Sequence, residues 1–172
     1  GLDMDTGMLA MAREKFPAVT FHQADMTDFH LGKQYGVVTC MFSSIGYVQT
    51  VDALNQTLKN FAEHVVSGGV VVIEPWFSSV LMKDKYLSID VVNEPDLKIS
   101  RMNVTSIEGN IAVLNFHYLI GKDGAITYFT EQHRLAMFTD DEYLSAFREA
   151  GLQVIHDPQG VNGRGLFIGI KA

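Results

Sequence analysis

The sequence predicts an α/β protein in which a parallel sheet, with helices between its strands, carries an antiparallel β insertion. Three observations predict it. Strand-like apolar runs alternate with helical periodicity up to residue 76. Three long strand-like runs then follow one another across residues 99–138 without a helix between them. A helix and two short strands close the chain, which suits a return to the first sheet.

The first 23 residues predict a strand, a helix and a second strand. Residues 1–3 have the pattern of a strand that ends just before a helix. The helix carries its apolar side chains on one face, stops before Pro17 and leads into a strand over residues 19–23. The apolar side chains of this helix are Met8, Leu9, Ala12 and Phe16.

The next two strands lie on either side of a second helix. Residues 35–42 are β-branched and nearly uncharged, which predicts a fully buried strand. Thr50 is expected to cap the helix, and a Gly68-Gly69 turn leads into another buried strand over residues 70–73. The apolar stripe of this helix consists of Leu54, Leu58, Phe61, Ala62 and Val65.

The insertion is predicted from its turns. Gly109-Asn110 separates strands over residues 99–107 and 111–120, and Asp123-Gly124 precedes a third strand over residues 125–138. After this meander, Thr139 and Glu142 have capping-box spacing for a helix. Strands over residues 152–156 and 165–170 are expected to complete the fold.

Composition excludes several classes of function. Hydrophobic residues make up 47% and charged residues 19%, and 20 acidic against 13 basic residues give a net charge of −7. This charge disfavours a nucleic-acid partner. The single cysteine, Cys40, excludes a disulfide within the chain and is expected to be buried. No apolar run is long enough to span a membrane and no signal peptide is visible, so a cytoplasmic location without a membrane partner is predicted.

Polar residues follow the first two predicted strands at the point where each strand ends. In an open parallel sheet, ligands bind beyond the carboxyl ends of the strands, and an acid there can accept both hydroxyls of a ribose. Asp3 is placed for that role, and Met4 for the face of an adenine. Asp25 is placed to accept from the adenine amino group, and the Met26 amide to donate to a ring nitrogen. Two alternatives stand beside this interpretation: Asp5 competes with Asp3 unless it is a helix N-cap, and Asp25 also suits an ordinary turn.

Several segments resemble the class I S-adenosylmethionine-dependent methyltransferases. Residues 1–13, GLDMDTGMLAMAR, resemble the G-(L/V)-(D/E)-x-S-x-x-M-L-x-x-A-R segment of that family. Residues 22–26, HQADM, resemble its acidic adenine-binding segment. Three further segments are similar to the N,N-dimethyltransferases of nucleotide-linked amino sugars of the desosamine and mycaminose type. They are residues 41–47 (MFSSIGY), 74–76 (EPW) and 163–169 (GRGLFIG).

The resemblance implies a Rossmann-like fold, S-adenosylmethionine as cofactor and methyl transfer to an amine of a small molecule, a nucleotide-linked amino sugar being the expected acceptor. It implies a cofactor side and an acceptor side. The cofactor side consists of Asp3, Met4, Asp25, Met26 and Met41; the acceptor side has Ser43, Tyr47, Trp76 and Arg164 as substrate-binding residues and His133 as the catalytic residue.

Each acceptor-side residue also has a plain structural explanation. Arg164 would hold a diphosphate through its planar guanidinium, but it equally suits a solvated loop. His133 would accept the amine proton, but it also suits an ordinary sheet surface. Trp76 suits core packing, and Ser43 and Tyr47 suit hydrogen bonds that complete a strand end. The six histidines show no metal-ligand spacing on one element, so no metal is predicted.

The sequence departs from the family pattern at its N-terminus. The first strand of the family, its glycine-rich loop and a helical cap are expected before Gly1, and that strand lies at the centre of the sheet order 3-2-1-4-5-7-6. The 172-residue chain by itself is therefore expected to bind the cofactor poorly. The predicted units are a partial cofactor domain over 1–78, an antiparallel insertion over 79–138 and a closing part over 139–172.

Three other hypotheses remain at this point. The first is a methyltransferase for another small-molecule acceptor. The second is a non-catalytic remnant or oligomerisation module that lacks the cofactor loop. The third is a Rossmann dehydrogenase, which shares the ribose acid but does not explain the Glu74-Pro75-Trp76 segment. A homodimer through the antiparallel sheet is a further prediction.

Overall fold

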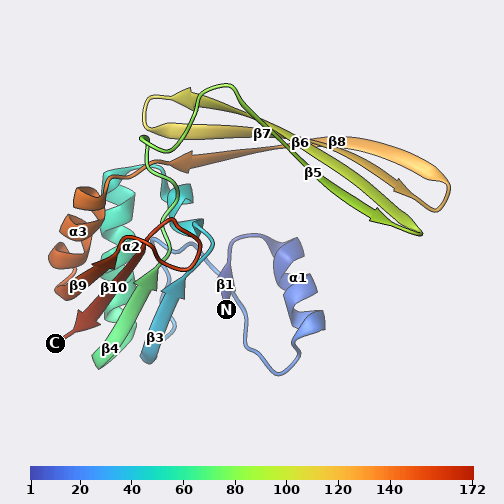
Figure 1. Cartoon of the computed structure of the whole chain (residues 1–172). Helices are drawn as coiled ribbons and strands as arrows, with labels where there is room; N and C mark the ends of the chain where they lie inside the picture. Colours follow the sequence, from blue (N-terminus) through green and yellow to red (C-terminus); the bar gives the residue numbers. More distant parts are fainter.

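The computed structural model describes residues 1–172 and arranges the strands in three separate sheets. A two-stranded sheet has the order β1-β2, a four-stranded sheet has the order β3-β4-β10-β9, and a second four-stranded sheet has the order β5-β6-β7-β8. The last of these is an antiparallel arm that extends well beyond the body of the molecule (Figure 1).

The smallest sheet is the first βαβ unit. Strands β1 (Leu2–Asp3) and β2 (His22–Gln23) pair in parallel, and α1 (Thr6–Lys15) connects them. The second strand is shorter than the predicted residues 19–23. The prediction that the apolar side chains of α1 form a buried face is also wrong. Only Leu9 is buried, while Met8 and Phe16 are exposed. Figure 1 shows the reason: α1 lies apart from the larger sheet, so those side chains have no sheet to cover them.

The larger sheet of the body is mixed. Strand β3 (Tyr35–Cys40) pairs in parallel with β4 (Val65–Ile73), and β10 (Leu166–Lys171) pairs antiparallel with both β4 and β9 (Leu152–Asp157). Backbone hydrogen bonding continues one residue past the strands, where the Glu74 amide donates to the Cys40 carbonyl over 2.9 Å. The carboxyl ends of β3 and β4 therefore lie side by side.

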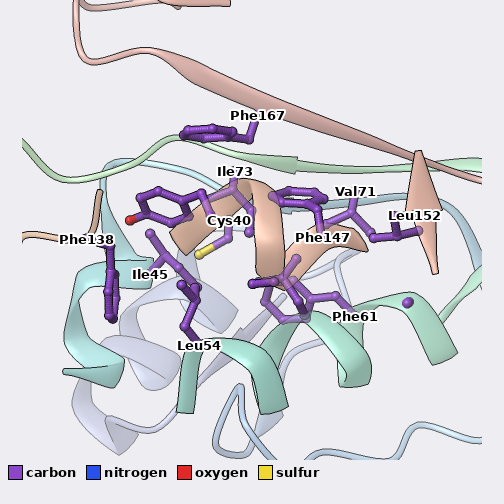
Figure 2. Packing of buried hydrophobic residues seen from close by; sticks show 14 of the residues in the cluster. Cys40, Ile45, Leu54, Phe61, Val71, Ile73, Phe138, Phe147, Leu152 and Phe167 are labelled. Carbon is purple, nitrogen blue, oxygen red and sulfur yellow. The ribbon is translucent and has the colours of Figure 1, made fainter. Parts of the chain in front are cut away.

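Two helices build the core on this sheet. Thr50 caps α2 (Val51–Glu63), and Thr139 forms the predicted capping box of α3 (Asp140–Glu149). Four of the five residues predicted for the α2 stripe are buried on that helix, and the fifth, Val65, is buried at the start of β4. Figure 2 shows side chains of these helices and strands packed together, including Leu54, Phe61, Phe147 and Phe167.

The predicted packing of Cys40 is confirmed. Its side chain is buried in the core, where burial raises the pKa of the thiol to about 12. The thiol therefore stays protonated at neutral pH, as suits a packing residue. No helix of the structure combines the length and the hydropathy that a membrane span requires.

Strand β3 differs from its prediction as a fully buried strand, because Gly36, Val37 and Thr39 are exposed and Val37 is 54% accessible. The cause is that β3 has a strand partner on one side alone. On its other side a cavity of about 530 Å³ separates it from β1 and β2. With β1-β2 on the far side of the cavity, the strand succession agrees with the expected order 3-2-1-4-5-7-6, and the cavity lies where the resemblance puts the first strand.

The antiparallel insertion has one strand more than predicted. Strands β6 (Leu97–Glu108), β7 (Ile111–Lys122) and β8 (Ala125–Ala136) match the three predicted strands, and β5 (Tyr86–Glu94) precedes them. Apolar residues alternate along β5, and Pro95-Asp96 forms its turn, but most of its side chains are exposed. The predicted fold class, a Rossmann-like sheet with an antiparallel insertion, is confirmed.

Candidate active site

Asp3 and Asp5, the two acids that compete for the predicted ribose contact, have different local roles at the end of β1. Asp5 is the N-cap of α1, where its Oδ1 accepts the Met8 amide over 2.8 Å. Asp3 lies at the strand end and its Oδ1 accepts the Asp5 amide over 2.8 Å. This turn fixes the direction of the exposed Asp3 carboxylate and leaves Oδ2 without a protein partner. Asp5 thus has the N-cap role, whereas Asp3 lies at the strand end where the resemblance expects the ribose acid, and its ligand contact stays a prediction.

The end of β2 repeats this arrangement. Asp25 Oδ1 accepts both the amide and the hydroxyl of Thr27, over 2.8 and 2.7 Å, so the predicted turn role is real. Its Oδ2 has no protein partner, which leaves room for a ligand as well. The Ala24 amide donates to the Asp3 carbonyl over 3.1 Å, so the two strand ends are adjacent. Both carboxylates lie at one edge of the β1-β2 sheet.

The predicted methionines of the cofactor side lie close to this edge. Met26 and Met41 both line the cavity of about 530 Å³ between β2 and β3. Met4 is largely exposed next to Asp3. Neither Asp3 nor Asp25 lines that cavity. The structure thus brings the two acids and two thioether side chains to neighbouring strand ends.

A buried carboxylate connects the β3 and β4 ends to the loop before β10. Glu74 is 1% exposed; its Oε2 accepts the Phe42 amide over 2.8 Å. Its Oε1 accepts Asn162 Nδ2 over 3.0 Å and Arg164 Nε and Nη2 over 3.1 and 2.6 Å. Burial acts to raise the pKa of Glu74, but these hydrogen bonds and the charge of Arg164 outweigh it and hold that pKa below its ordinary value.

This network holds a strained turn. Phe42 and Ser43 both have left-handed backbone angles, with φ of 53° and 64°, a conformation that is costly for residues other than glycine. Glu74 fixes the Phe42 amide, and Ser43 Oγ donates to the Pro75 carbonyl over 2.8 Å. Ser43 is buried and its hydroxyl proton is used inside the protein. The substrate-binding role predicted for Ser43 stays a prediction, and in this structure the residue ties two strand ends together.

Two residues predicted separately for the acceptor side are in contact. The Tyr47 hydroxyl lies 2.6 Å from His133 Nδ1, although 86 residues separate them in the chain. Tyr47 lies on a short 3-10 helix, η1 (Ser44–Val48), and His133 on β8. Gly46 allows η1 to pack closely against Leu135 of β8 and against Trp76. A Cβ at this position would lie 3.1 Å from Leu135 and 3.3 Å from Trp76. The pair joins the body to the antiparallel sheet.

A second cavity, of about 620 Å³, lies between Trp76 and one face of the antiparallel sheet. The register of the strands defines this inner face, because directly opposed residues of neighbouring strands point to the same side. Its members are Tyr86, Ser88, Asp90, Arg101, Asn103, Thr105, Leu114, Phe116, Tyr118, Phe129, Glu131 and His133. His133 therefore shares a face with the residues that line the cavity.

Two polar atoms at this cavity have no partner. Trp76 Nε1 is a buried donor and Asn103 Oδ1 a buried acceptor, and neither makes a hydrogen bond. Asn103 is only 5% exposed, and its amide nitrogen donates to Thr105 over 3.0 Å. Unpaired buried polar atoms are costly, so both atoms would gain from a hydrogen-bond partner that a ligand or a local rearrangement supplies. The sequence analysis missed Asn103, for which only the cross-strand register is a signal.

Acids at the ends of adjacent parallel strands and a final antiparallel strand pair in the larger sheet agree with a class I S-adenosylmethionine-dependent methyltransferase, and the comparisons with known proteins show that class. A family model described as a methyltransferase domain matches residues 1–69. The chain is 39% identical, over its whole length and 73% of the relative, to a dTDP-3-amino-3,4,6-trideoxy-alpha-D-glucopyranose N,N-dimethyltransferase from Streptomyces venezuelae. It is 41% identical, over 99% of its length and 67% of the relative, to a dTDP-3-amino-3,6-dideoxy-alpha-D-glucopyranose N,N-dimethyltransferase from Streptomyces fradiae.

Solved structures agree with these relatives. Streptomyces venezuelae DesVI superimposes with a TM-score of 0.95 at 39% identity, covering all of this chain and 73% of that one. The amino pentose methyltransferase CalS10, from a Micromonospora and with S-adenosylmethionine bound, superimposes with a TM-score of 0.90 at 32% identity over the same shares. This chain belongs to the amino-sugar N,N-dimethyltransferase family of the S-adenosylmethionine-dependent methyltransferases.

The residues present fit S-adenosylmethionine as cofactor. Asp3 and Asp25 each keep one carboxylate oxygen free at adjacent strand ends, which suits the hydroxyl and amino donors of an adenosine. Met26 and Met41 are apolar residues that follow β2 and β3, as the resemblance expects for residues beside the adenosine. The net charge of −7 also suits a cationic cofactor.

Proposed function

We propose that this enzyme methylates the amino group of a nucleotide-linked amino sugar, with the acceptor in the cavity of about 620 Å³ beside Trp76. One observation carries the proposal. Trp76 and Asn103, each with a buried polar atom that has no protein partner, line a cavity against the sheet face that also carries His133. A sugar offers hydroxyl groups that can pair with both atoms. The relatives, named as dTDP-amino-sugar N,N-dimethyltransferases, support the same class of acceptor.

On the cofactor side, Asp3 would accept the ribose hydroxyls and Asp25 the adenine amino group, through their free oxygens. Met4 and Met26 would lie against the adenine, and Met41 would border the site at the end of β3. S-adenosylmethionine, when bound, supplies an electrophilic methyl group on a cationic sulfur. The protein then has to hold an amine in line with that group, which supplies much of the acceleration.

On the acceptor side, Tyr47 and His133 would take the proton that the amine has to lose before it attacks. A protonated amine has no lone pair, so a proton acceptor is needed for each methyl added. Trp76 and Asn103 would bind the sugar, and Ser43 would keep the strand ends in place.

Arg164 has two candidate roles. Its Nε and Nη2 are engaged by Glu74, which makes it a positioning residue for the turn at Phe42. Its guanidinium also lies 5.6 Å from the ring of Phe77, a residue that lines the acceptor cavity. The predicted diphosphate contact stays a prediction, and Nη1 is the atom left to make it.

The proposed domain organisation keeps the predicted boundaries. Residues 1–78 and 139–172 form the cofactor unit, and residues 79–138, which include β5 to β8, form the acceptor-binding insertion. The outer face of that insertion carries exposed Leu87, Ile89 and Val91. These side chains are the structural basis for the predicted homodimer.

The experiment is a panel of acceptors with isotopically labelled S-adenosylmethionine, using the protein expressed from its full reading frame. The panel contains dTDP-3-amino and dTDP-4-amino sugars, the free amino sugars and simple amines. We expect label on a dTDP-amino sugar. Transfer to other amines alone would favour a different small-molecule acceptor. No transfer together with no binding of S-adenosylhomocysteine in calorimetry would favour the non-catalytic module.

A further inference from the structure

Tyr47 of η1 and two side chains of the inner face, His133 and Glu131, follow one another from the body toward solvent. The Tyr47 hydroxyl lies 2.6 Å from His133 Nδ1, and His133 Nε2 lies 3.6 Å from Glu131 Oε2. Glu131 and His133 are two residues apart on β8, so they share the inner face, and Phe116 lies opposite Glu131 on β7. The Phe116 ring packs edge-on against His133 with 5.4 Å between centroids. The imidazole is thus held on three sides.

The position of the Glu131 carboxylate decides which nitrogen of His133 carries the proton. A proton on Nε2 faces the carboxylate favourably, whereas a lone pair on Nε2 would be repelled by it. Nδ1 is then the acceptor, so the Tyr47 hydroxyl donates to it. Burial, and secondly the negative charge of Glu131, raise the pKa of Tyr47, so that its hydroxyl keeps its proton at neutral pH.

We propose that Glu131 is a positioning residue which sets the tautomer of His133, so that Tyr47 and His133 relay the proton of the acceptor amine to solvent. This inference rests on the proposed function and adds Glu131 to it. With the Tyr47 proton directed at Nδ1, the lone pairs of its oxygen are free to accept from an ammonium group.

The proposed step balances. One N–H bond of the ammonium breaks and leaves its electron pair on nitrogen, ready for the methyl group. The released proton bonds to the Tyr47 oxygen as the Tyr47 proton moves to His133 Nδ1, which gives an imidazolium beside the Glu131 carboxylate. The imidazolium then loses a proton to water, because the His133 and Glu131 side chains are 34% and 49% exposed. Loss of the Nε2 proton leaves His133 protonated on Nδ1, so a further exchange with water, in which Nε2 gains a proton and Nδ1 loses one, resets the relay before a second methyl transfer.

Other charged groups on neighbouring strands also face Glu131. Burial raises the pKa of Tyr118 on β7; its contact with Arg101 opposes that rise and its contact with Glu131 supports it. Arg101 on β6 pairs in turn with Asp90 on β5 over 2.7 Å. The side-chain hydrogen bonds of Arg101 thus go to Asp90, and the carboxylate that faces His133 is that of Glu131.

The test uses the enzyme from its full reading frame, with Glu131→Leu and Glu131→Gln. We expect kcat to fall about 10-fold to 100-fold in Glu131→Leu, as for lost orienting partners elsewhere, and less in Glu131→Gln, whose amide oxygen still presents a partial negative charge to Nε2. The acceptor KM and the affinity for S-adenosylhomocysteine should stay within about twofold, because neither contact is removed. The matched control is Glu108→Gln, an exposed carboxylate on the same sheet that pairs with Arg134, which should leave kcat unchanged.

A second readout is independent of activity. Nitrogen NMR of labelled histidine should show His133 protonated on Nε2 in the wild type and shifted toward Nδ1 protonation in Glu131→Leu. Unchanged kcat in Glu131→Leu, or Nδ1 protonation already in the wild type, would overturn the inference. If no acceptor is methylated by the wild type, the proposed function fails, and the NMR tautomer still decides whether Glu131 orients His133.

Discussion

The two sides of the candidate active site are built in different ways. On the cofactor side, Asp3 and Asp25 follow short strands directly, and a local turn orients each carboxylate. On the acceptor side, Tyr47 and His133 meet across 86 residues, and Asn103 is placed by strand register. The difference teaches that strand ends can position groups locally, whereas a sheet face positions them through long-range pairing. Changes on one side should therefore leave binding on the other side intact.

The largest expected effect is a loss of unfolding free energy at Glu74, the residue where the cofactor side and the acceptor side join. Glu74→Gln removes the buried charge that pairs with Arg164, and breaking such a pair costs about 3–5 kcal/mol. Urea unfolding should show this loss at neutral pH. The matched control, Glu108→Gln, breaks an exposed pair with Arg134 and should cost less than about 1 kcal/mol. Equal losses in the two variants would show that the buried network does not connect the two sides.

The pH dependence of the unfolding free energy of the same variant tests whether Glu74 is ionised in the folded protein. The pKa of Glu74 is lower in the folded protein than its ordinary value of about 4.3, so its stabilisation is present above that value. It is lost as pH falls through the lowered pKa of the folded state. The difference in unfolding free energy between wild type and Glu74→Gln should therefore shrink in acid. A difference that grows in acid would contradict the assigned ionisation.

The next effect concerns the cofactor side alone. Asp3→Ala should weaken binding of S-adenosylhomocysteine about 100-fold in calorimetry, since it removes a charged acceptor for two hydroxyls. Asp5→Ala is the control: it removes the N-cap of α1 and should cost about 1 kcal/mol of stability with little change in affinity. If the two variants exchanged these effects, the ribose would belong to Asp5.

A smaller effect is expected on the acceptor side. Asn103→Leu removes the unpaired Oδ1 and should raise the KM for the acceptor about 10-fold, the value of one hydrogen bond. Affinity for S-adenosylhomocysteine should be unchanged, because Asn103 lies on β6, away from the ends of β1 and β2. Met102→Leu, at the neighbouring position on the outer face, should change neither quantity. An altered cofactor affinity in Asn103→Leu would remove the separation of the two sides.

The smallest effect on chemistry is expected from the outer face. Ile89→Lys places a charge among exposed apolar side chains opposite the inner face. We expect sedimentation to show a loss of the predicted homodimer, with kcat changed less than about twofold, since no inner-face residue is touched. A wild-type protein that sediments as a monomer would contradict the homodimer.

The signals for the cofactor side are local, because a strand end, an acid and a helix lie within a few residues of one another. The structure confirms that Asp5 is a helix N-cap and that Asp3 lies at the end of β1, while the cofactor contacts stay predictions. The fold class and the insertion were equally visible in the order of strands and helices. The burial of β3 was predicted wrongly, because it depends on a neighbour and not on its own apolar residues.

The acceptor side was predictable in part, for a physical reason. Tyr47, Trp76 and His133 were selected through the resemblance, but nothing local in the sequence indicates that Tyr47 contacts His133. Asn103 and Glu131 acquire meaning only from the residues opposite them in the sheet. Ser43 ties strand ends together, a role that depends on the turn that Glu74 holds and that no local sequence signal shows.

The most direct test is a crystal structure of the protein from its full reading frame with S-adenosylhomocysteine and a dTDP-amino sugar bound. The account predicts the ribose on Asp3, the adenine beside Asp25, and the amino sugar between Trp76 and Asn103 with its nitrogen at Tyr47. A sugar on the outer face of the sheet, or Asp3 and Asp25 turned away from the nucleoside, would contradict it.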